Sequence, residues 1–317
     1  MTLEASRRNP RRVTADSLEH RARTALRPRY DAPMPETVRI TETLRDAWQG
    51  LPRPVPTDAK VAFAQRLLDA GFRHLDVGSF VSPSRVPAMA DTADVLTRLR
   101  VPADARLTAL VASPSGLQRL LAAPHVGEVL YPFSLSERFQ KRNTERGREE
   151  AFALLRDLAA GAHAEGRTVY ATISMAFGNN EGDAFDTGEL RAWVERLAGE
   201  AGVDRVGLAD TTAQATPALI RDVFAAVARA GAPVPAAHLH VTPENQEALV
   251  GAALDAGCRA FDSALGALGG CQFAKGATSN VSTLPLVAQL RARGLAADVP
   301  EAPLPALDAA ARALARG

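Results

Sequence analysis

His238 and His240 are separated by one leucine at the end of a predicted β-strand, and this spacing is typical of a metal site. Successive side chains of a strand point to opposite faces, so both imidazoles project from one face while Leu239 packs on the other. Two imidazoles on one face can bind the same cation. The pattern is short, so two unrelated imidazoles are the alternative interpretation.

Two further segments carry groups that complement these histidines. Thr43-Leu44-Arg45-Asp46 closes the first predicted strand and places a guanidinium beside a carboxylate that can bind a metal. Gly269-Gly270-Cys271 precedes Asn280 and offers an acid–base thiol, and the two glycines predict an exposed loop in which that thiol is reactive. The alternatives are a simple ion pair for Arg45 and Asp46, and an inert core residue for Cys271.

After about residue 35 the chain alternates short aliphatic or β-branched runs with longer amphipathic stretches, which is typical of repeated βα units around a parallel sheet. Eight runs are predicted strands: Thr37–Thr43, His74–Ser79, Leu107–Ala112, Glu128–Pro132, Thr168–Met175, Arg205–Ala209, Ala236–Val241 and Arg259–Ser263. Predicted helices include Asp58–Ala70, Glu149–Glu165, Thr187–Ala201, Pro217–Ala230 and Glu244–Ala256. No Gly-x-Gly-x-x-Gly turn follows the first strand, so the pattern favours an α/β fold of the (β/α)₈ TIM-barrel type over a dinucleotide-binding sheet.

A TIM barrel places its chemistry at the C-terminal ends of its strands. Polar residues gather at those predicted ends: Arg45, Asp46, Asp76, Ser79, Ser134, Ser174, Asp210, His238 and His240, with Cys271 and Asn280 beyond the eighth strand. The pattern therefore predicts one active site at this end of the barrel.

Length and composition fit one barrel with appendages. The chain has 317 residues, and barrels of this type commonly form one domain of about 250 residues. We expect residues 1–35 to be an Arg-rich, partly disordered N-terminal extension and residues 36–317 to be the barrel with C-terminal helices. The eight arginines of the extension, Arg7, Arg8, Arg11, Arg12, Arg21, Arg23, Arg27 and Arg29, either contact an acidic partner or subunit or form a solvated arm.

The net charge of +1 gives no reason to expect a nucleic-acid or membrane partner. The first thirty residues contain no apolar signal region, and no apolar run approaches the roughly 20 residues that span a bilayer. Two cysteines, Cys258 and Cys271, are too few for a disulfide framework. We therefore expect a cytoplasmic protein.

Several longer motifs occur in an order that resembles the 3-hydroxy-3-methylglutaryl-CoA (HMG-CoA) lyase family. They are Phe80-Val81-Ser82-Pro83 with Val86-Pro87-Ala88-Met89 and Asp91, then the run from Ser136 to Asn143, then the run from Gly269 to Ala277 with Asn280 and Val281. The likeness extends from about residue 36 to 295. This family belongs to a group of metal-dependent lyase and synthase barrels that includes isopropylmalate synthase.

The resemblance implies a divalent cation held by Asp46, His238, His240 and Asn280, with Mg²⁺ or Mn²⁺ expected and Zn²⁺ as the alternative. It implies retro-Claisen cleavage of a 3-hydroxyacyl-CoA, in which Arg45 stabilises an enolate and Cys271 protonates it. Asp76 and Asp210 would orient Arg45 or help to take the hydroxyl proton; as an alternative, they are structural carboxylates bonded to loop amides. We expect substrate contacts from Gln49, Ser79, Ser134, Asn143 and Ser174, and a homodimer.

Four segments depart from the family pattern. Arg45-Asp46-Ala47-Trp48 stands where Arg-Asp-Gly is usual, and Asp76 stands where the family has Glu. Val241-Thr242-Pro243-Glu244 and Gly178-Asn179-Asn180-Glu181-Gly182 also differ from the usual runs. These departures predict a reshaped pocket, and two other hypotheses therefore stay open. The first is another lyase or a Claisen-type synthase acting on a 2-keto acid. The second is a catalytically silent barrel that binds a partner through its Arg-rich extension.

Overall fold

The structure is a computed structural model that describes residues 37–231, 235–270 and 278–316. The chain divides into two units, Met1–Met34 and Pro35–Gly317. The Arg-rich extension predicted over residues 1–35 and the predicted acid Cys271 lie outside the described residues.

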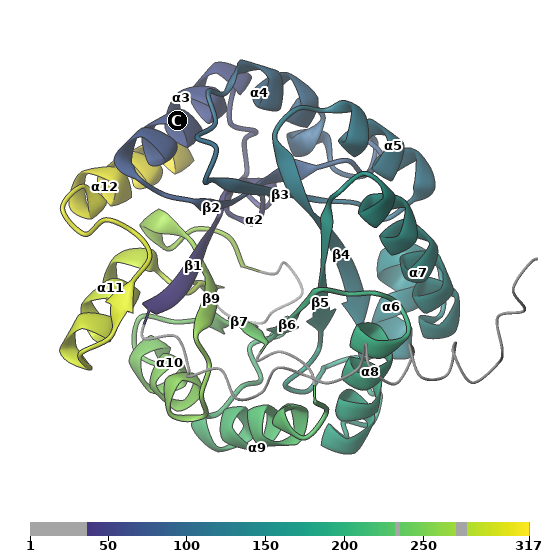
Figure 1. The fold of residues 1–317 in the computed structure, drawn as a ribbon. Coiled ribbons are helices and arrows are strands. Elements are labelled where there is room, and N and C mark those ends of the chain that lie inside the picture. The colour runs from purple at the N-terminus through teal and green to yellow at the C-terminus, as the bar shows by residue number, and fades with distance from the viewer. Residues whose placement is uncertain (1–36, 232–234, 271–277, 317) are drawn as a thin grey trace, which may run out of the picture. The chain divides into compact units, whose positions relative to one another are not determined.

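Eight parallel strands close into a barrel, because the first strand pairs with both the second and the last (Figure 1). The closing register joins Arg39 to Ala260 and Glu42 to Ser263. The barrel strands are β1 (Thr37–Thr43), β2 (His74–Ser79), β3 (Arg106–Leu110), β4 (Val126–Ser134), β5 (Thr168–Ser174), β6 (Arg205–Ala209), β7 (Ala236–His238) and β9 (Ala260–Ser263). The predicted (β/α)₈ fold is confirmed.

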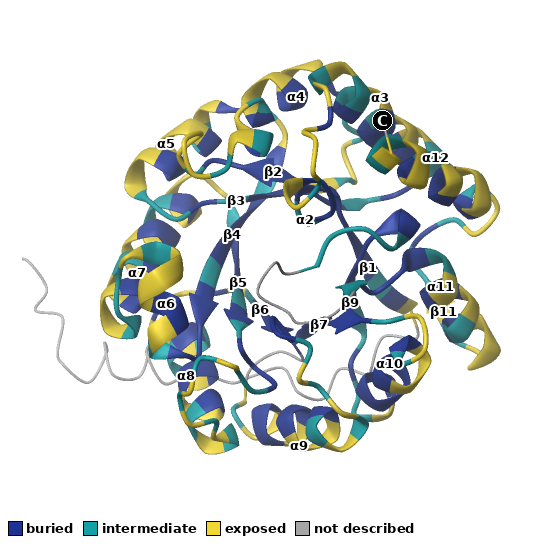
Figure 2. Ribbon diagram, turned by 180° about the vertical axis from the view of Figure 1, so that it is seen from behind, coloured by how far each residue is buried: buried dark blue, intermediate teal, exposed yellow. Residues whose placement is uncertain are grey.

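Helices form a ring outside the strands and bury their apolar sides against them, while their outer sides are exposed (Figure 2). The principal helices are α3 (Thr57–Ala70), α4 (Thr92–Arg98), α5 (Pro114–Ala122), α6 (Glu137–Thr144), α7 (Arg148–Ala164), α8 (Thr187–Gly199), α9 (Pro217–Ala228), α10 (Gln246–Asp255), α11 (Thr283–Ala292) and α12 (Leu304–Arg316). Shorter elements are α2 (Leu44–Gln49), η1 (Pro87–Met89), η2 (Leu265–Ala267) and β11 (Ala296–Ala297), which pairs with β1. None of the described helices is both long and apolar enough to cross a bilayer.

Local sequence signals explain where several helices begin. The side chains of Ser113, Ser136, Asp186 and Thr216 each accept a hydrogen bond from a backbone N–H of the first turn. Such caps satisfy donors that the helix leaves unpaired. Proline follows Ser113 and Thr216 directly, at a position where its missing N–H costs nothing.

The seventh predicted strand is divided at Leu239. Ala236–His238 belongs to the barrel as β7, whereas β8 (His240–Val241) leaves it and pairs antiparallel with β10 (Ser279–Asn280). In this second pairing His240 lies opposite Asn280. The prediction of one continuous strand was therefore wrong, but the division brings His240 next to another predicted ligand.

Glu42 ties β1 to the segment that follows β9. Its carboxylate accepts hydrogen bonds from the backbone N–H of Leu265, at 2.6 Å, and from the hydroxyl of Thr283, at 2.7 Å. Burial raises the pKa of this carboxyl to about 7, although both hydrogen bonds lower it in part. Glu42 is thus a buried acid whose protonation is linked to folding.

Glu42→Gln should flatten the pH dependence of stability between pH 4.5 and about 7. In this range the folded wild type keeps the Glu42 proton that the unfolded chain releases, so its stability falls as the pH rises. The glutamine stays neutral, and the difference in unfolding free energy between the two proteins should change by about 3 kcal/mol across the range. Urea denaturation at about pH 5 and about pH 8 measures it.

The exposed Glu247, whose carboxyl is not buried, gives the matched control Glu247→Gln. This control should follow the wild-type pH dependence. Parallel stability curves for wild type and Glu42→Gln would contradict the assignment.

Candidate metal centre and active site

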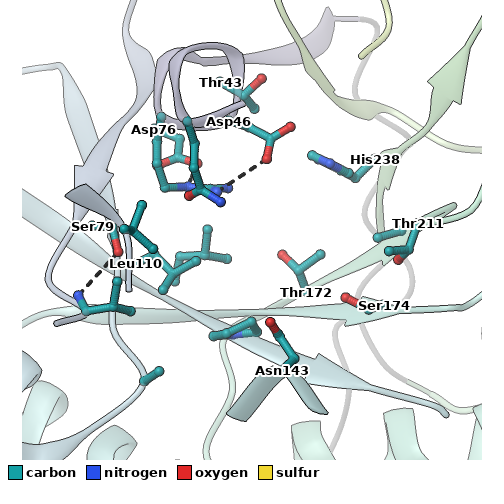
Figure 3. A pocket seen from close by; sticks show the side chains of 18 of the residues that line it. Thr43, Asp46, Asp76, Ser79, Leu110, Asn143, Thr172, Ser174, Thr211 and His238 are labelled. Carbon is teal, nitrogen blue, oxygen red and sulfur yellow. Dashed lines mark hydrogen bonds and ion pairs between the residues drawn. The ribbon is translucent and has the colours of Figure 1, made fainter. Parts of the chain in front are cut away.

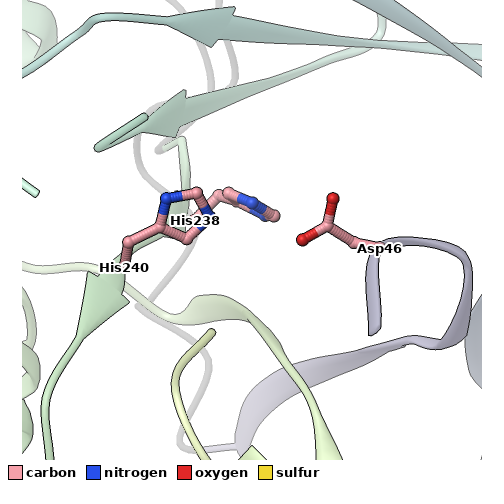
Figure 4. Close-up of side chains that lie close together, drawn as sticks. All are labelled: Asp46, His238 and His240. Carbon is pink, nitrogen blue, oxygen red and sulfur yellow. The ribbon is translucent and has the colours of Figure 1, made fainter. Parts of the chain in front are cut away.

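Three potential metal ligands meet at the C-terminal end of the barrel. Asp46 comes from α2, directly after β1, while His238 ends β7 and His240 begins β8. One ligand atom of each lies within 4.8 Å of those of the other two, and Figure 4 shows the three side chains pointing toward one another. The arrangement can hold one cation between the first and seventh strands of the barrel.

Asn280 completes the group of predicted ligands. Its amide Nδ2 donates to Asp46 Oδ2 at 2.8 Å and to the carbonyl of Leu268 at 3.2 Å. Gly269 lies against the Asn280 side chain and the backbone carbonyl oxygen of Asp46. It is half-buried with φ +79°, and an added Cβ would overlap the Asn280 amide. This close packing, together with the positive φ, is what requires glycine at this position.

The surroundings of His240 fit a cation. Its Nδ1 lies 3.3 Å from the carbonyl oxygen of Thr211, which can only accept, so Nδ1 carries the hydrogen. Its Nε2 is buried and has no hydrogen-bond partner among the described residues. Burial, helped by His238, lowers the pKa of His240 to about 4 and keeps the ring neutral. A buried lone pair without a partner is costly, and a metal ion would satisfy it.

Asp46 supplies the negative charge of the site. Burial alone would raise the pKa of its carboxyl, but Arg45 and both histidines outweigh burial and lower it to about 2. A carboxylate, two imidazoles and an amide oxygen form a ligand set between hard and intermediate. These four residues fit a divalent cation such as Mg²⁺ or Mn²⁺.

Arg45 lies beside this centre and is held from two sides. Its Nε donates to Asp76 Oδ2 at 2.8 Å, and its Nη1 lies 3.3 Å from Asp46 Oδ1. Its side chain is only 9% exposed. Burial raises the pKa of Asp76 to about 6, although Arg45 opposes this in part. The structure thus brings the guanidinium into contact with two of the predicted site residues.

A cavity of about 550 Å³ opens beside these residues. Figure 3 shows Asp46 and His238 on one side of it, with Asn143, Thr172 and Ser174 across from them. Of the substrate contacts expected from the sequence, four line the cavity: Gln49, Ser79, Asn143 and Ser174.

Three predicted site residues that the structure describes do not line the cavity, namely Asn280, Ser134 and Asp210. Ser134 accepts a hydrogen bond from the backbone of Ser136 at 3.1 Å. Asp210 accepts from the backbone N–H groups of Gln214, at 2.7 Å, and Ala215, at 3.1 Å, and burial raises its pKa to about 6. These contacts are those of a structural carboxylate bonded to loop amides, as in the alternative interpretation of Asp210.

The cavity also contains residues that sequence reasoning missed. They include Thr41, Thr43, Thr108, Tyr170, Thr172 and Asp262. The signal that could have found them is the two-residue period of the strands, since Thr41 and Thr43, or Tyr170, Thr172 and Ser174, must face the barrel interior together. Their hydroxyls and carboxylate make that interior polar.

Comparison with known proteins supports this architecture. The HMGL-like family profile matches residues 38–309. The rat cytoplasmic 3-hydroxy-3-methylglutaryl-CoA lyase is 32% identical over 264 residues, which cover 83% of this chain and 76% of that protein. A 3-hydroxy-3-isohexenylglutaryl-CoA/hydroxy-methylglutaryl-CoA lyase from Pseudomonas aeruginosa is 33% identical over 255 residues, which cover 79% and 83% respectively.

Solved structures give the same relationship. The HMG-CoA lyase of Brucella melitensis has a TM-score of 0.83 and 30% identity, covering 89% of this chain and 100% of that one. An HMG-CoA lyase from Acinetobacter baumannii, in complex with coenzyme A and 3-methylmalate, has a TM-score of 0.83 and 28% identity, covering 90% and 93%.

His238→Ala should weaken Mn²⁺ binding by at least about tenfold, because it removes one of the grouped ligands. Isothermal titration calorimetry of the purified protein measures the affinity. His163→Ala provides the control, since His163 is half exposed and pairs with Asp204 at the surface. Equal Mn²⁺ affinity in wild type and His238→Ala would exclude this cluster as the metal site.

Proposed function

The chain belongs to the HMGL-like family of carbon–carbon lyases, and from this we propose that it cleaves HMG-CoA or a related 3-hydroxyacyl-CoA to acetyl-CoA and a 3-keto acid. The observation that carries the proposal is the meeting of Asp46, His238 and His240 beside the buried guanidinium of Arg45. The CoA complex of the Acinetobacter relative supports a thioester substrate.

In the proposed reaction, the bond between C2 and C3 of the substrate breaks and its electron pair stays on C2, giving an acyl-CoA enolate. The hydroxyl on C3 loses its proton to solvent in the cavity and becomes the ketone oxygen. A cation held by Asp46, His238, His240 and Asn280 would supply Lewis acidity that lowers the pKa of that hydroxyl.

Arg45 is suited to stabilise the enolate. It is permanently charged, buried and pre-oriented, and such a donor is most effective where water is excluded. Asp76 accepts from Nε and so directs the guanidinium. We therefore assign Asp76 to the orientation of Arg45, and Asp210 to holding the loop after β6. Cys271, by resemblance, would then protonate C2 of the enolate.

We further propose Mg²⁺ or Mn²⁺ as the metal, a homodimer and a cytoplasmic location. The carboxylate and amide oxygens favour the two harder cations over Zn²⁺. The rat relative that carries the name of a cytoplasmic enzyme supports the location. The homodimer rests on the resemblance and is tested by light scattering of the purified protein.

Arg45→Met should lower the rate of acetyl-CoA formation from HMG-CoA by about 10²- to 10³-fold, because the enolate loses its charged donor. Mass spectrometry of acetyl-CoA, with Mg²⁺ or Mn²⁺ present, measures the rate. Arg196→Met is the matched control, since Arg196 pairs with Glu149 at the surface.

If the wild type forms no acetyl-CoA from any 3-hydroxyacyl-CoA, but consumes acetyl-CoA with a 2-keto acid, the chain is a Claisen-type synthase instead. Unchanged cleavage by Arg45→Met would remove Arg45 from the mechanism while leaving the activity itself established.

The rate should also depend on the protonation of Asp76. As the pH falls through about 6, Asp76 gains a proton and its ion pair with Arg45 weakens, so kcat/KM should fall. Asp76→Asn should be less active and should lose this acidic limb, whereas Asp76→Glu should keep it. Rates from about pH 5 to about pH 8 at saturating Mn²⁺ test this, and an unchanged limb in Asp76→Asn would assign it to another group.

A further inference from the structure

Asp262 on β9 faces the cavity and has no role in the reaction proposed above. It is buried, and one oxygen of its carboxylate contacts two partners. Oδ2 accepts from the Tyr170 hydroxyl at 2.9 Å and lies 3.3 Å from Nδ1 of His238. Asp262 therefore connects a metal-ligand candidate to a tyrosine deeper in the barrel.

Tyr170 is fixed so that its hydroxyl can reach Asp262. The guanidinium carbon of Arg205 lies 3.5 Å from the centre of the Tyr170 ring, a cation–π contact. Arg205 is held in turn by Glu128 at 2.8 Å. On the neighbouring strand, a Cβ at Gly207 would overlap the tyrosine hydroxyl. The absence of a side chain at Gly207 thus leaves the space that the hydroxyl occupies.

Asp262 and Tyr170 together determine which nitrogen of His238 faces the other ligands. The tyrosine donates its only hydroxyl hydrogen to Oδ2, and a carboxylate oxygen can accept a second donor but cannot give one. His238 Nδ1 must therefore be the donor, so in the neutral ring Nε2 is the nitrogen whose lone pair can bind a cation. His240 is oriented in the same way by the carbonyl of Thr211.

We propose that Asp262 is a positioning residue that fixes His238 as an Nε2 metal ligand, and that Tyr170 holds Asp262 in this orientation. This inference rests on the proposed metal site. Carboxylate partners of ligand histidines orient the ring, and their loss commonly weakens metal affinity by about 10- to 100-fold. Asp262 then acts on the metal through His238 without being a ligand itself.

The test compares Mn²⁺ affinity, by isothermal titration calorimetry, with the melting temperature of the metal-free protein. Asp262→Asn offers an amide in place of the carboxylate, and we expect its affinity to fall by about 10- to 100-fold. Tyr170→Phe removes one oxygen and keeps the ring over Arg205, so we expect a smaller loss of about two- to tenfold. This second variant carries the test if Asp262→Asn does not fold.

Asp308→Asn is the matched control. Asp308 is another buried carboxylate, and it accepts from the backbone N–H of Gly266 at 2.7 Å and from Arg312 at 2.9 Å. We expect this change to lower the melting temperature of the metal-free protein and to leave Mn²⁺ affinity within twofold of wild type.

The outcomes separate the inference from the proposed function. If wild type binds Mn²⁺ and the folded variants at Asp262 and Tyr170 bind it equally well, the positioning role is wrong while the metal site stands. If Asp308→Asn loses as much affinity as the folded test variants, the effect is general destabilisation and the inference is also overturned. A wild type that binds no Mn²⁺ would overturn the metal site and the inference together.

Discussion

The site depends on the contacts of one carboxylate, that of Asp46. Arg45 lies on one oxygen at 3.3 Å and Asn280 donates to the other at 2.8 Å, while His238 and His240 approach within reach of a shared cation. These partners come from α2, directly after β1, and from β7, β8 and β10, so the barrel must close before they can meet. The Asp46 side chain is only 19% exposed, and a carboxylate so largely removed from water would be costly without these partners, which couples the formation of the site to the closure of the fold.

Sequence patterns identified most of the barrel because its strands have a clear period. The bounds of β1, β2 and β6 agree with the runs predicted from apolar and β-branched residues. The break at Leu239 could not be predicted, since it depends on pairing between His240 and Asn280, which are far apart in the chain. The roles of Gly207 and Gly269 could not be predicted either. Each glycine leaves room for a side chain that is distant in the sequence, Tyr170 for Gly207 and Asn280 for Gly269.

The barrel interior below the site is not simply an apolar core. Glu128 pairs with Arg205, Arg205 covers Tyr170, and Tyr170 donates to Asp262. Burying these charges is favourable only where each is paired. Replacing one member would leave its neighbours buried without a partner, at the full cost of their desolvation. The network that pairs the buried polar groups of the lower barrel therefore ends on the ring of His238. The same residues thus contribute both to the stability of the fold and to the geometry of the proposed metal site.

The departures from the family pattern differ in how closely they bear on the cavity. In the altered segment after Asp46, Trp48 is buried and packs edge-on against Phe63, so this departure from the family pattern lies in the hydrophobic core. The segment from Gly178 to Gly182 is different: Glu181 binds both terminal nitrogens of Arg142 at 2.6 Å, and Arg142 lines the cavity. Because the ligands of the proposed metal lie elsewhere, this segment can alter the space for the acyl group without altering the chemistry beside Arg45.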